Sequence, residues 1–374
     1  MTEGLWKGHY PKAGYSDDST CPKSYSTCSS KNPWNQTMWV DWGPSHIFLV
    51  QNTNATENLY NCFLQYNYKR TLFWPLCSME LMANMYGSKD SQTCIRQSPL
   101  FNITPLTVCD LLSDNNIHYF ASPRNGTIPS SQTKEQSDES VIVVSARLDA
   151  LSMFDQVEVG FDTPATGIVT LLTTAHLVSQ AMKTMRYKAG VENVLFLLIH
   201  GESFDYIGSS RLVYDMENMA FPFNKSKSEA AETFYKNGTQ PLFTKTNIMS
   251  FLELGQLSNS QGSDEIFMHS LNNPKEMVDT LRSNKGSLST MAVNNIPPAS
   301  VKSFLKDSSI PSVVLTNFER DYTNTMYHSI YDSADFNQYQ YQEQGEDQKV
   351  VKHLAMVSMM VVRQLLRWRT RPAW

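Results

Sequence analysis

Residues 197–216 have the sequence LLIHGESFDYIGSSRLVYDM. The apolar run at its start ends at Gly201, beside Glu202, and a segment with helical spacing begins directly afterwards. Many α/β enzymes place a functional carboxylate in this way, on the loop that follows a buried strand. The stretch therefore raises the question of whether Glu202 is a working base or the remnant of one.

From residue 141 onwards the sequence alternates between strand and helix patterns. VIVVSARLD (141–149) is apolar and β-branched, as expected of a strand buried on both faces. This alternation predicts an α/β fold, with a twisted, mostly parallel sheet and helices on both faces. Further strands are expected at 194–199, 248–255, 264–271 and 312–318, with a helix near 274–286.

Two of the expected helices show a clear apolar stripe. Thr163 and Pro164 suit the N-cap and the first residue of a helix. Apolar side chains then recur at helical spacing at Ile168, Leu171, Ala175, Val178 and Met182. The last helix repeats this pattern with Val350, Leu354, Val357, Val361 and Leu365. We expect both stripes to pack against the sheet.

Composition narrows the possible functions. The chain has 374 residues, of which 41% are hydrophobic, and a formal net charge of −5. That charge argues against nucleic acid as a partner, because phosphate binding needs a clustered basic surface. No apolar run reaches the roughly 18 residues that a membrane-spanning helix requires.

The first third of the chain has a different character, with short apolar runs between turn residues. Its six cysteines have spacings that suggest sequential disulfides: Cys21, Cys28, Cys62, Cys77, Cys94 and Cys109. Six N-x-S/T sequons are glycosylation candidates: Asn35, Asn54, Asn102, Asn125, Asn224 and Asn237. We expect a smaller, Cys-rich segment of loops and strands over 1–135, the remnant of an N-terminal lobe, and a large lobe over 136–374. The polar stretch 124–140 would link them.

The cysteines and sequons together point to the lumen of the secretory pathway. The sequence MTEGLWKGHYPK at residues 1–12 contains no apolar signal-peptide core. We therefore expect the chain to be a fragment or an incomplete gene model.

Acidic and histidine side chains fall at the ends of several expected strands. Because the carboxyl ends of parallel strands meet at one edge of a sheet, these side chains are expected to line a common crevice. They are Asp149, Asp162, Glu202, Glu253 and His328.

Residues 141–335 resemble the M28 family of zinc aminopeptidases. The family's five signature blocks correspond in order to ARLDA (146–150), GFDTPATG (160–167), GESFDYIGS (201–209), FLELG (251–255) and YHSIYDS (327–333). The resemblance implies an M28-like sheet and a crevice that, in the family, holds two metal ions.

The metal ligands of that family are largely replaced. By the resemblance, Arg147 stands at the first ligand histidine and Ser203 at a ligand glutamate. Thr163 falls at the bridging aspartate, with Asp162 one residue early, and the register of Glu253 is open. Asp149, Glu202 and His328 match the family pattern. Catalytic zinc usually needs three protein ligands and a water, so no metal or other cofactor is expected, including residual zinc at His328.

Without a metal-bound water, Glu202 has two other roles open to it. A buried carboxylate can bind an ammonium group, such as a free peptide N-terminus, or it can cap the helix that follows. For His328, a structural role is favoured over metal ligation once the partner ligands are gone.

GESFDYIGSSRLVYDM also resembles the nicastrin family of γ-secretase subunits, most closely across the DYIGS motif. VVSARLD, FLELGQ, SIYDSAD and TCIRQSPLFNITPLTVCDLLSD (93–114) add to the resemblance, which covers about residues 60–370. It implies a role for the GESFDYIGS block in substrate recognition or assembly, through Glu202, Asp205, Tyr206, Ile207, Gly208 and Ser209.

What the resemblance implies is a non-catalytic ectodomain subunit with an M28-like fold. Such a subunit stabilises γ-secretase and either binds or sterically screens membrane-protein stubs, while presenilin carries out the intramembrane proteolysis. Presenilin, the other γ-secretase subunits and the ectodomain stubs of type I membrane proteins would be the partners, on the luminal or extracellular side. The alternative is a luminal M28 aminopeptidase with a rearranged metal site using Asp162, Glu253 and His328.

Overall fold

A computed structural model describes residues 50, 52–69, 76–78, 114–122, 140–151, 159–184, 193–204, 206–218, 221, 243–259, 264–294, 296–305, 308–319, 322, 324, 326–333 and 347–369. The chain divides into two compact units, one of which comprises residues 41–113.

The larger unit is built on a seven-stranded sheet with the order β1-β3-β2-β4-β7-β5-β6. Its strands are β1 (Ile117–Phe120), β2 (Val141–Arg147), β3 (Asn193–Ile199), β4 (Ile248–Leu254), β5 (Glu265–Leu271), β6 (Ser289–Val293) and β7 (Ser312–Thr316). The central strands β3, β2, β4 and β7 are parallel, whereas β1 pairs antiparallel with β3 and β5 pairs antiparallel with β7. The predicted fold class is confirmed.

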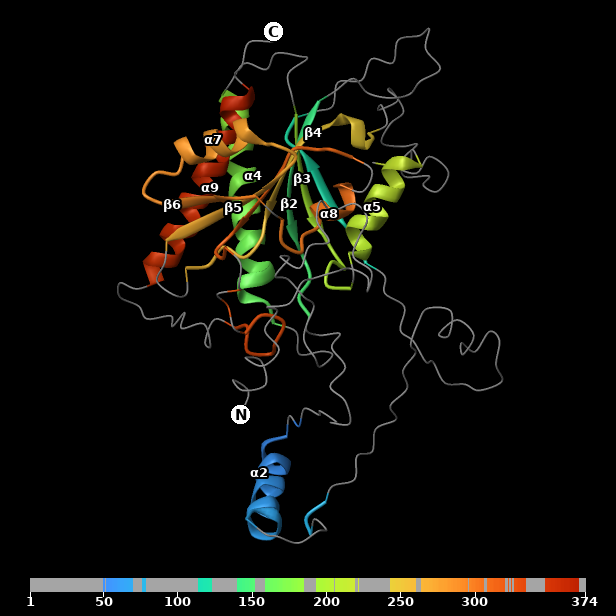
Figure 1. Cartoon of the computed structure of the whole chain (residues 1–374), viewed down its shortest axis with the longest axis vertical. Coiled ribbons are helices and arrows are strands. Elements are labelled where there is room, and N and C mark those ends of the chain that lie inside the picture. Colours follow the sequence, from blue (N-terminus) through green and yellow to red (C-terminus); the bar gives the residue numbers. More distant parts are fainter. Residues whose placement is uncertain are drawn as a thin grey trace, which may run out of the picture. The chain divides into compact units, whose positions relative to one another are not determined.

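Helices cover both faces of this sheet (Figure 1). One layer holds α4 (Gly167–Thr184), α7 (Lys275–Ser283) and α9 (Asp347–Arg369), and the other holds α5 (Ile207–Glu217) and α8 (Val301–Leu305). A short π-helical turn, η3 (Phe161–Thr166), leads into α4, and a 3-10 turn, η4 (Lys245–Asn247), leads into β4.

The sheet separates two apolar cores because successive side chains of a strand point to opposite faces. On β2, Ile142 and Val144 belong to the core beneath α4, α7 and α9, while Val141 and Val143 belong to the core beneath α5 and α8. The central strands are therefore buried on both faces, which explains why they appear in the sequence as continuous apolar runs.

The two predicted helical stripes are confirmed except at Val350, which belongs to neither core. Residues from both stripes are buried in the first of these cores or pack against it: Ile168, Leu171, Ala175, Val178 and Met182 from α4, and Leu354, Val357, Val361 and Leu365 from α9. Thr163 has an extended backbone just before Pro164, as expected of an N-cap. Its Oγ1 nevertheless has no hydrogen-bond partner, so the side chain does not cap the helix.

The described part of the smaller unit is a helix followed by turn and loop residues, whereas loops and strands were expected there. Its helix α2 (Thr53–Cys62) continues into the π-helical turn η2 (Phe63–Asn67). Asn52 Oδ1 caps α2 by accepting the Ala55 N–H. A disulfide joins Cys62 to Cys77, which confirms one of the predicted sequential pairs.

The remaining predicted cysteines and most of the sequons lie outside the described residues. This applies to Cys21, Cys28, Cys94, Cys109, Asn35, Asn102, Asn125, Asn224 and Asn237. Asn54 is described and exposed on α2. The predicted linker, apart from Ser140, is also outside them. Strand β1 precedes that linker in the sequence and is part of the sheet of the larger unit.

Candidate functional site: a crevice at the carboxyl ends of the central strands

The sequence-predicted site residues converge where β3, β2 and β4 end. Arg147 is the last residue of β2 and pairs in register with Ile199, the last residue of β3. Glu253 lies in β4 opposite Ser145 of β2. The loops after β2 and β3, which carry Asp149 and Glu202, therefore leave the sheet at the same edge, as expected for ligand sites in α/β folds.

Asp149 organises the loop that carries Glu202. Its two carboxylate oxygens accept the backbone N–H groups of Glu202, at 2.9 Å, and Ser203, at 2.6 Å. Burial alone would raise the pKa of the Asp149 carboxyl, but the Arg147 charge and these hydrogen bonds outweigh it, and the pKa lies below its ordinary value. Asp149 is thus a fixed anion beside Glu202.

Glu202 is fully buried, and its two oxygens have different surroundings. Oε1 accepts the backbone N–H of Ser209 at 2.6 Å, in the first turn of α5, so this oxygen caps the helix. Oε2 has no hydrogen-bond partner. Burial raises the pKa of the Glu202 carboxyl from 4.5 to about 7, against the opposing effects of the Arg147 charge and of the Ser300 and Ser209 hydrogen-bond donors. Capping thus uses one oxygen, while the other lies buried near Arg147 and the Ser300 hydroxyl.

Arg147 places a buried positive charge in the crevice. Its side chain is 7% exposed, Nη1 donates to the Tyr327 hydroxyl at 3.4 Å, and the guanidinium lies over the Tyr206 ring, 5.8 Å from its centroid. Burial alone would lower the pKa of Arg147, but the phenols of Tyr327 and Tyr206 and the carboxylates of Asp149 and Glu202 raise it. The guanidinium therefore stays charged.

Glu253 is directed to the short helix α8. Its two oxygens accept the backbone N–H groups of Ser300 and Val301, each at 2.8 Å, immediately before and at the start of that helix. Burial raises the pKa of the Glu253 carboxyl, and these two hydrogen bonds oppose the rise. Glu253 is therefore engaged as a helix cap.

Asp162 is likewise fully engaged, by groups on the segments that follow β4 and β7. Its oxygens accept the Ser258 N–H and the Asn317 amide, each at 3.0 Å. Burial raises the pKa of Asp162, and the hydrogen bonds from Ser258 and Asn317 oppose the rise. The neighbouring Thr163 side chain is buried and makes no hydrogen bond.

His328 is held against Tyr327. The two rings stack with centroids 3.8 Å apart, and His328 has a left-handed backbone with a φ of 57°. Its Nε2 is buried without a hydrogen-bond partner. Burial and the Arg147 charge lower the pKa of His328 to about 3, so the ring is neutral at physiological pH.

The DYIGS motif connects the crevice to α5. Tyr206, in a left-handed conformation with a φ of 58°, precedes the helix, and its ring is buried. Gly208 lies so close to the His200 carbonyl that a Cβ would overlap it. Ser209 Oγ lies 2.8 Å from Ser303 Oγ of α8, while Ile207 is exposed. Asp205 lies outside the described residues.

Several participants were not found by sequence reasoning. Asn116 fixes the approach of α5 by accepting the His200 N–H and donating to the Gly208 carbonyl. Tyr327 stands in the quoted block YHSIYDS and could have been found there, and Asn317 follows a recognised strand. Nothing in the local pattern marks Asn116 or Ser300, because their partners are distant in sequence.

The crevice does not fit the zinc site that the M28 resemblance implies. A charged guanidinium occupies the first ligand position and repels a metal ion. Glu253 and Asp162 direct their oxygens to backbone and amide donors. Among the described residues, no three His, Cys, Asp or Glu side chains are grouped to hold a metal. The cluster instead holds two opposite charges that act on each other, Arg147 and Asp149, and a titratable glutamate.

Both parts of the chain are similar to known proteins of one family. The family model of the nicastrin large lobe matches residues 140–366, and that of the nicastrin small lobe matches residues 5–87. Human nicastrin is 31% identical over 313 residues, covering 77% of this chain and 40% of that protein. Mouse nicastrin is 30% identical over 348 residues, which cover 85% of this chain and 45% of that protein. The chain thus spans less than half the length of these relatives.

Two solved structures illustrate the structural likeness. A crystal structure of the γ-secretase component nicastrin has 20% identity and a TM-score of 0.48, covering 66% of this chain and 42% of that one. A zinc aminopeptidase from Bacillus subtilis has 14% identity and a TM-score of 0.42, and the match covers 67% of this chain and 49% of that one. Because the large-lobe model alone matches more than half of the sequence, the chain belongs to the nicastrin family.

Proposed function

We propose that this chain acts as a non-catalytic ectodomain subunit of a γ-secretase complex, in which it stabilises the assembly and recognises or sterically screens membrane-protein stubs. In this proposal it works on the luminal or extracellular side of the secretory pathway or plasma membrane. Its partners are presenilin, which cuts the substrate, and the other subunits. Membership of the nicastrin family supports the proposal.

The observation that carries the non-catalytic part is the buried charge of Arg147. The guanidinium lies among Asp149, Glu202, Tyr206 and Tyr327, where a hydrolase of related sequence would hold metal ligands. A hydrolytic metal site would need this cation removed and at least one further carboxylate. We therefore propose that the chain uses neither zinc nor another cofactor.

Glu202 is proposed as the recognition group. Its Oε2 is buried and without a partner, so a ligand cation that reached it would gain a charge-assisted hydrogen bond. With a pKa of about 7, the carboxyl gains its charge near neutral pH. A peptide α-amine, whose ordinary pKa is about 8, is still charged in that range. An amine-binding role predicts the tightest binding between about pH 7 and about pH 8.

One experiment separates a pseudo-enzyme from an aminopeptidase. The purified full chain is analysed for bound zinc and assayed with aminoacyl substrates, with Glu202→Gln in parallel. We expect neither stoichiometric zinc nor hydrolysis that depends on Glu202. Stoichiometric zinc together with activity lost in Glu202→Gln would favour the M28-like alternative. Among the described residues, its suggested ligands Asp162, Glu253 and His328 form no metal-binding group.

A second experiment tests assembly and recognition. The chain, expressed in cells lacking their own subunit of this type, is expected to co-purify with presenilin and restore intramembrane cleavage. Two stubs of equal length, with free and acetylated N-termini, then separate amine binding from steric screening. Equal processing of both stubs, together with cleavage lost when the ectodomain is lengthened, supports screening and rules out recognition of the amine.

A further inference from the structure

A concave surface lies between α9 and the turn that follows α7. Its volume is about 630 Å³, and α9 contributes Lys352, Ala355, Met356, Met359 and Arg363 to its lining. The side chains at these positions recur at intervals of three or four residues, so they share one face of the helix. This face of α9 and the turn at residues 284–287 are called the α9 groove below.

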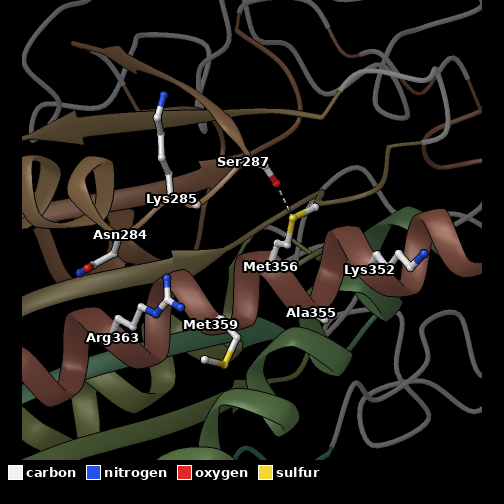
Figure 2. A pocket seen from close by; sticks show the side chains of 9 residues that line it. Asn284, Lys285, Ser287, Lys352, Ala355, Met356, Met359 and Arg363 are labelled. Atoms are coloured by element: carbon white, nitrogen blue, oxygen red, sulfur yellow. Dashed lines mark hydrogen bonds between the residues drawn. The ribbon is translucent and has the colours of Figure 1, made fainter.

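The centre of the α9 groove is apolar and accessible. Met359 is 39% exposed, and Met356 accepts a hydrogen bond from the Ser287 hydroxyl across the groove. Unbranched methionines adapt their shape to different partners, which suits them to a binding surface. Figure 2 shows both thioethers between Lys352 and Arg363.

The charges around the α9 groove are all positive. Lys285, Lys352 and Arg363 line it, and no lining residue is acidic. Within the described part of the chain, none of these three cations has an ion pair. Asn284 also lines the groove, but its amide nitrogen is buried. The groove therefore offers donors and positive charge around an apolar centre, and complements an anionic partner with apolar side chains.

The spacing of the cations indicates the shape of that partner. Lys352 and Arg363 are 11 residues apart on one helix face, which corresponds to roughly 16 Å along the axis. Figure 2 shows them on either side of the methionines and not converging on one point. A single phosphate group would need cations within one contact distance. A peptide with carboxylates at both ends of an apolar stretch fits the observed separation.

We propose that the α9 groove is a docking surface for an acidic, amphipathic peptide segment of a partner protein. The segment lays apolar side chains over Met356 and Met359 and places carboxylates at Lys352 and Arg363. This is the helix-in-groove type of recognition, in which apolar anchors supply binding energy and flanking charges fix orientation. The inference does not depend on the crevice or on Glu202.

The test uses the full chain and a designed probe. A fluorescent helical peptide carries leucines along one face and glutamates 11 residues apart, and its matched peptide has glutamine at both positions. By fluorescence anisotropy, we expect the glutamate peptide to bind at least about fivefold more tightly, and less so at high salt. Lys352→Glu combined with Arg363→Glu should weaken it by about tenfold or more. Lys275→Glu, a single charge reversal at the start of α7 and outside the groove, should alter affinity by less than about twofold.

Three outcomes would overturn the proposal. The first is equal binding of the glutamate and glutamine peptides, or binding that the double substitution leaves unchanged. The second is tighter, Lys352-dependent binding to phosphatidylserine vesicles than to the peptide, which would identify a lipid surface. The third is a dimer, detected by sedimentation, that the double substitution dissociates, because the occupant would then be a second copy of this chain. Circular dichroism of each variant confirms that it is folded.

Discussion

At the scale of single residues, the crevice is governed by one cation and two carboxylates with different ionisation. Arg147 and Asp149 keep opposite charges, because the pKa of the Asp149 carboxyl is lowered and that of the Arg147 guanidinium is raised. Glu202 shares the same cation but is more strongly affected by burial, so its pKa is about 7. The net charge of the crevice therefore falls by one as pH rises through neutrality.

Stability should depend on pH through Glu202. Because its pKa is raised in the folded state, the carboxyl holds its proton more tightly there than in the unfolded chain. The stability this provides is complete below about pH 4.5 and is lost as pH rises through about 7. Glu202→Gln has no such loss. When the pH is raised from about 5.5 to about 8, the free energy of unfolding of the variant, measured in urea, should increase by about 2 kcal/mol relative to that of the parent.

The matched control for this prediction is Glu276→Gln, an exposed glutamate on α7. It should show no comparable change between the two pH values. A difference between Glu202→Gln and the parent that stays constant with pH would mean that the Glu202 carboxyl ionises normally in the folded protein.

Arg147 and Glu202 should be energetically coupled, and the coupling should also depend on pH. Arg147→Met leaves Asp149 buried without its cation and removes the hydrogen bond to Tyr327, so we expect a loss of about 3 kcal/mol. Adding Glu202→Gln should recover part of this loss at about pH 8, where Glu202 is ionised, and little at about pH 5.5. A double-mutant cycle in urea measures both values. Additive effects at both pH values would show that the two side chains do not interact.

At the scale of elements, α5 is positioned by a close backbone contact with the end of β3. Gly208 lies against the His200 carbonyl, and Asn116 bridges the two residues with a pair of hydrogen bonds. The small residue in DYIGS is therefore needed for packing. Because the same turn carries Glu202 and Tyr206, the position of α5 also determines how the crevice is shaped.

Gly208→Ala tests this contact. A Cβ would overlap backbone that cannot move without displacing α5, so we expect the free energy of unfolding to fall by about 3 kcal/mol. Hydrogen exchange at the start of that helix should also become faster. Gly286→Ala is the control, because a Cβ there meets nothing within 4 Å and only its φ of 63° is unfavourable. That variant should lose about 1 kcal/mol. Similar losses for both variants would mean that α5 can shift to accommodate the methyl group.

At the scale of the whole molecule, sequence patterns predicted what is periodic and missed what depends on distant partners. β2 and β3 were recognisable as continuous apolar runs because both faces of each strand are buried. α4 and α9 were recognisable by an apolar stripe because one side of each helix is buried. The edge strands β1 and β6 were missed, since each is short and partly exposed. No local pattern showed that the carboxylate oxygens of Glu253 and Asp162 would accept hydrogen bonds from residues far away in the chain.

The smaller unit should depend on its disulfide more than the larger unit does. None of the described residues of α2 or η2 is buried, so little apolar packing holds this segment. The Cys62–Cys77 bond closes a loop with a sequence separation of 15, and such a closure contributes about 3 kcal/mol. With serine at both positions, limited proteolysis should cut residues 50–78 much faster and leave 140–369 unchanged. Equal protection with and without the bond would contradict this expectation.

The position of α9 has a consequence for how the chain is made. It completes the apolar core on the α4 side of the sheet, yet it follows β7, the last strand, by about 30 residues of sequence. During translation the α5 and α8 layer can close as soon as β7 emerges, while Leu171 and Val178 still lack their partners from α9. Released chains truncated just after residue 316 should therefore bind chaperones that the chain of 374 residues does not. One apolar face of the sheet is covered early, and the other stays exposed to other proteins until α9 has been synthesised.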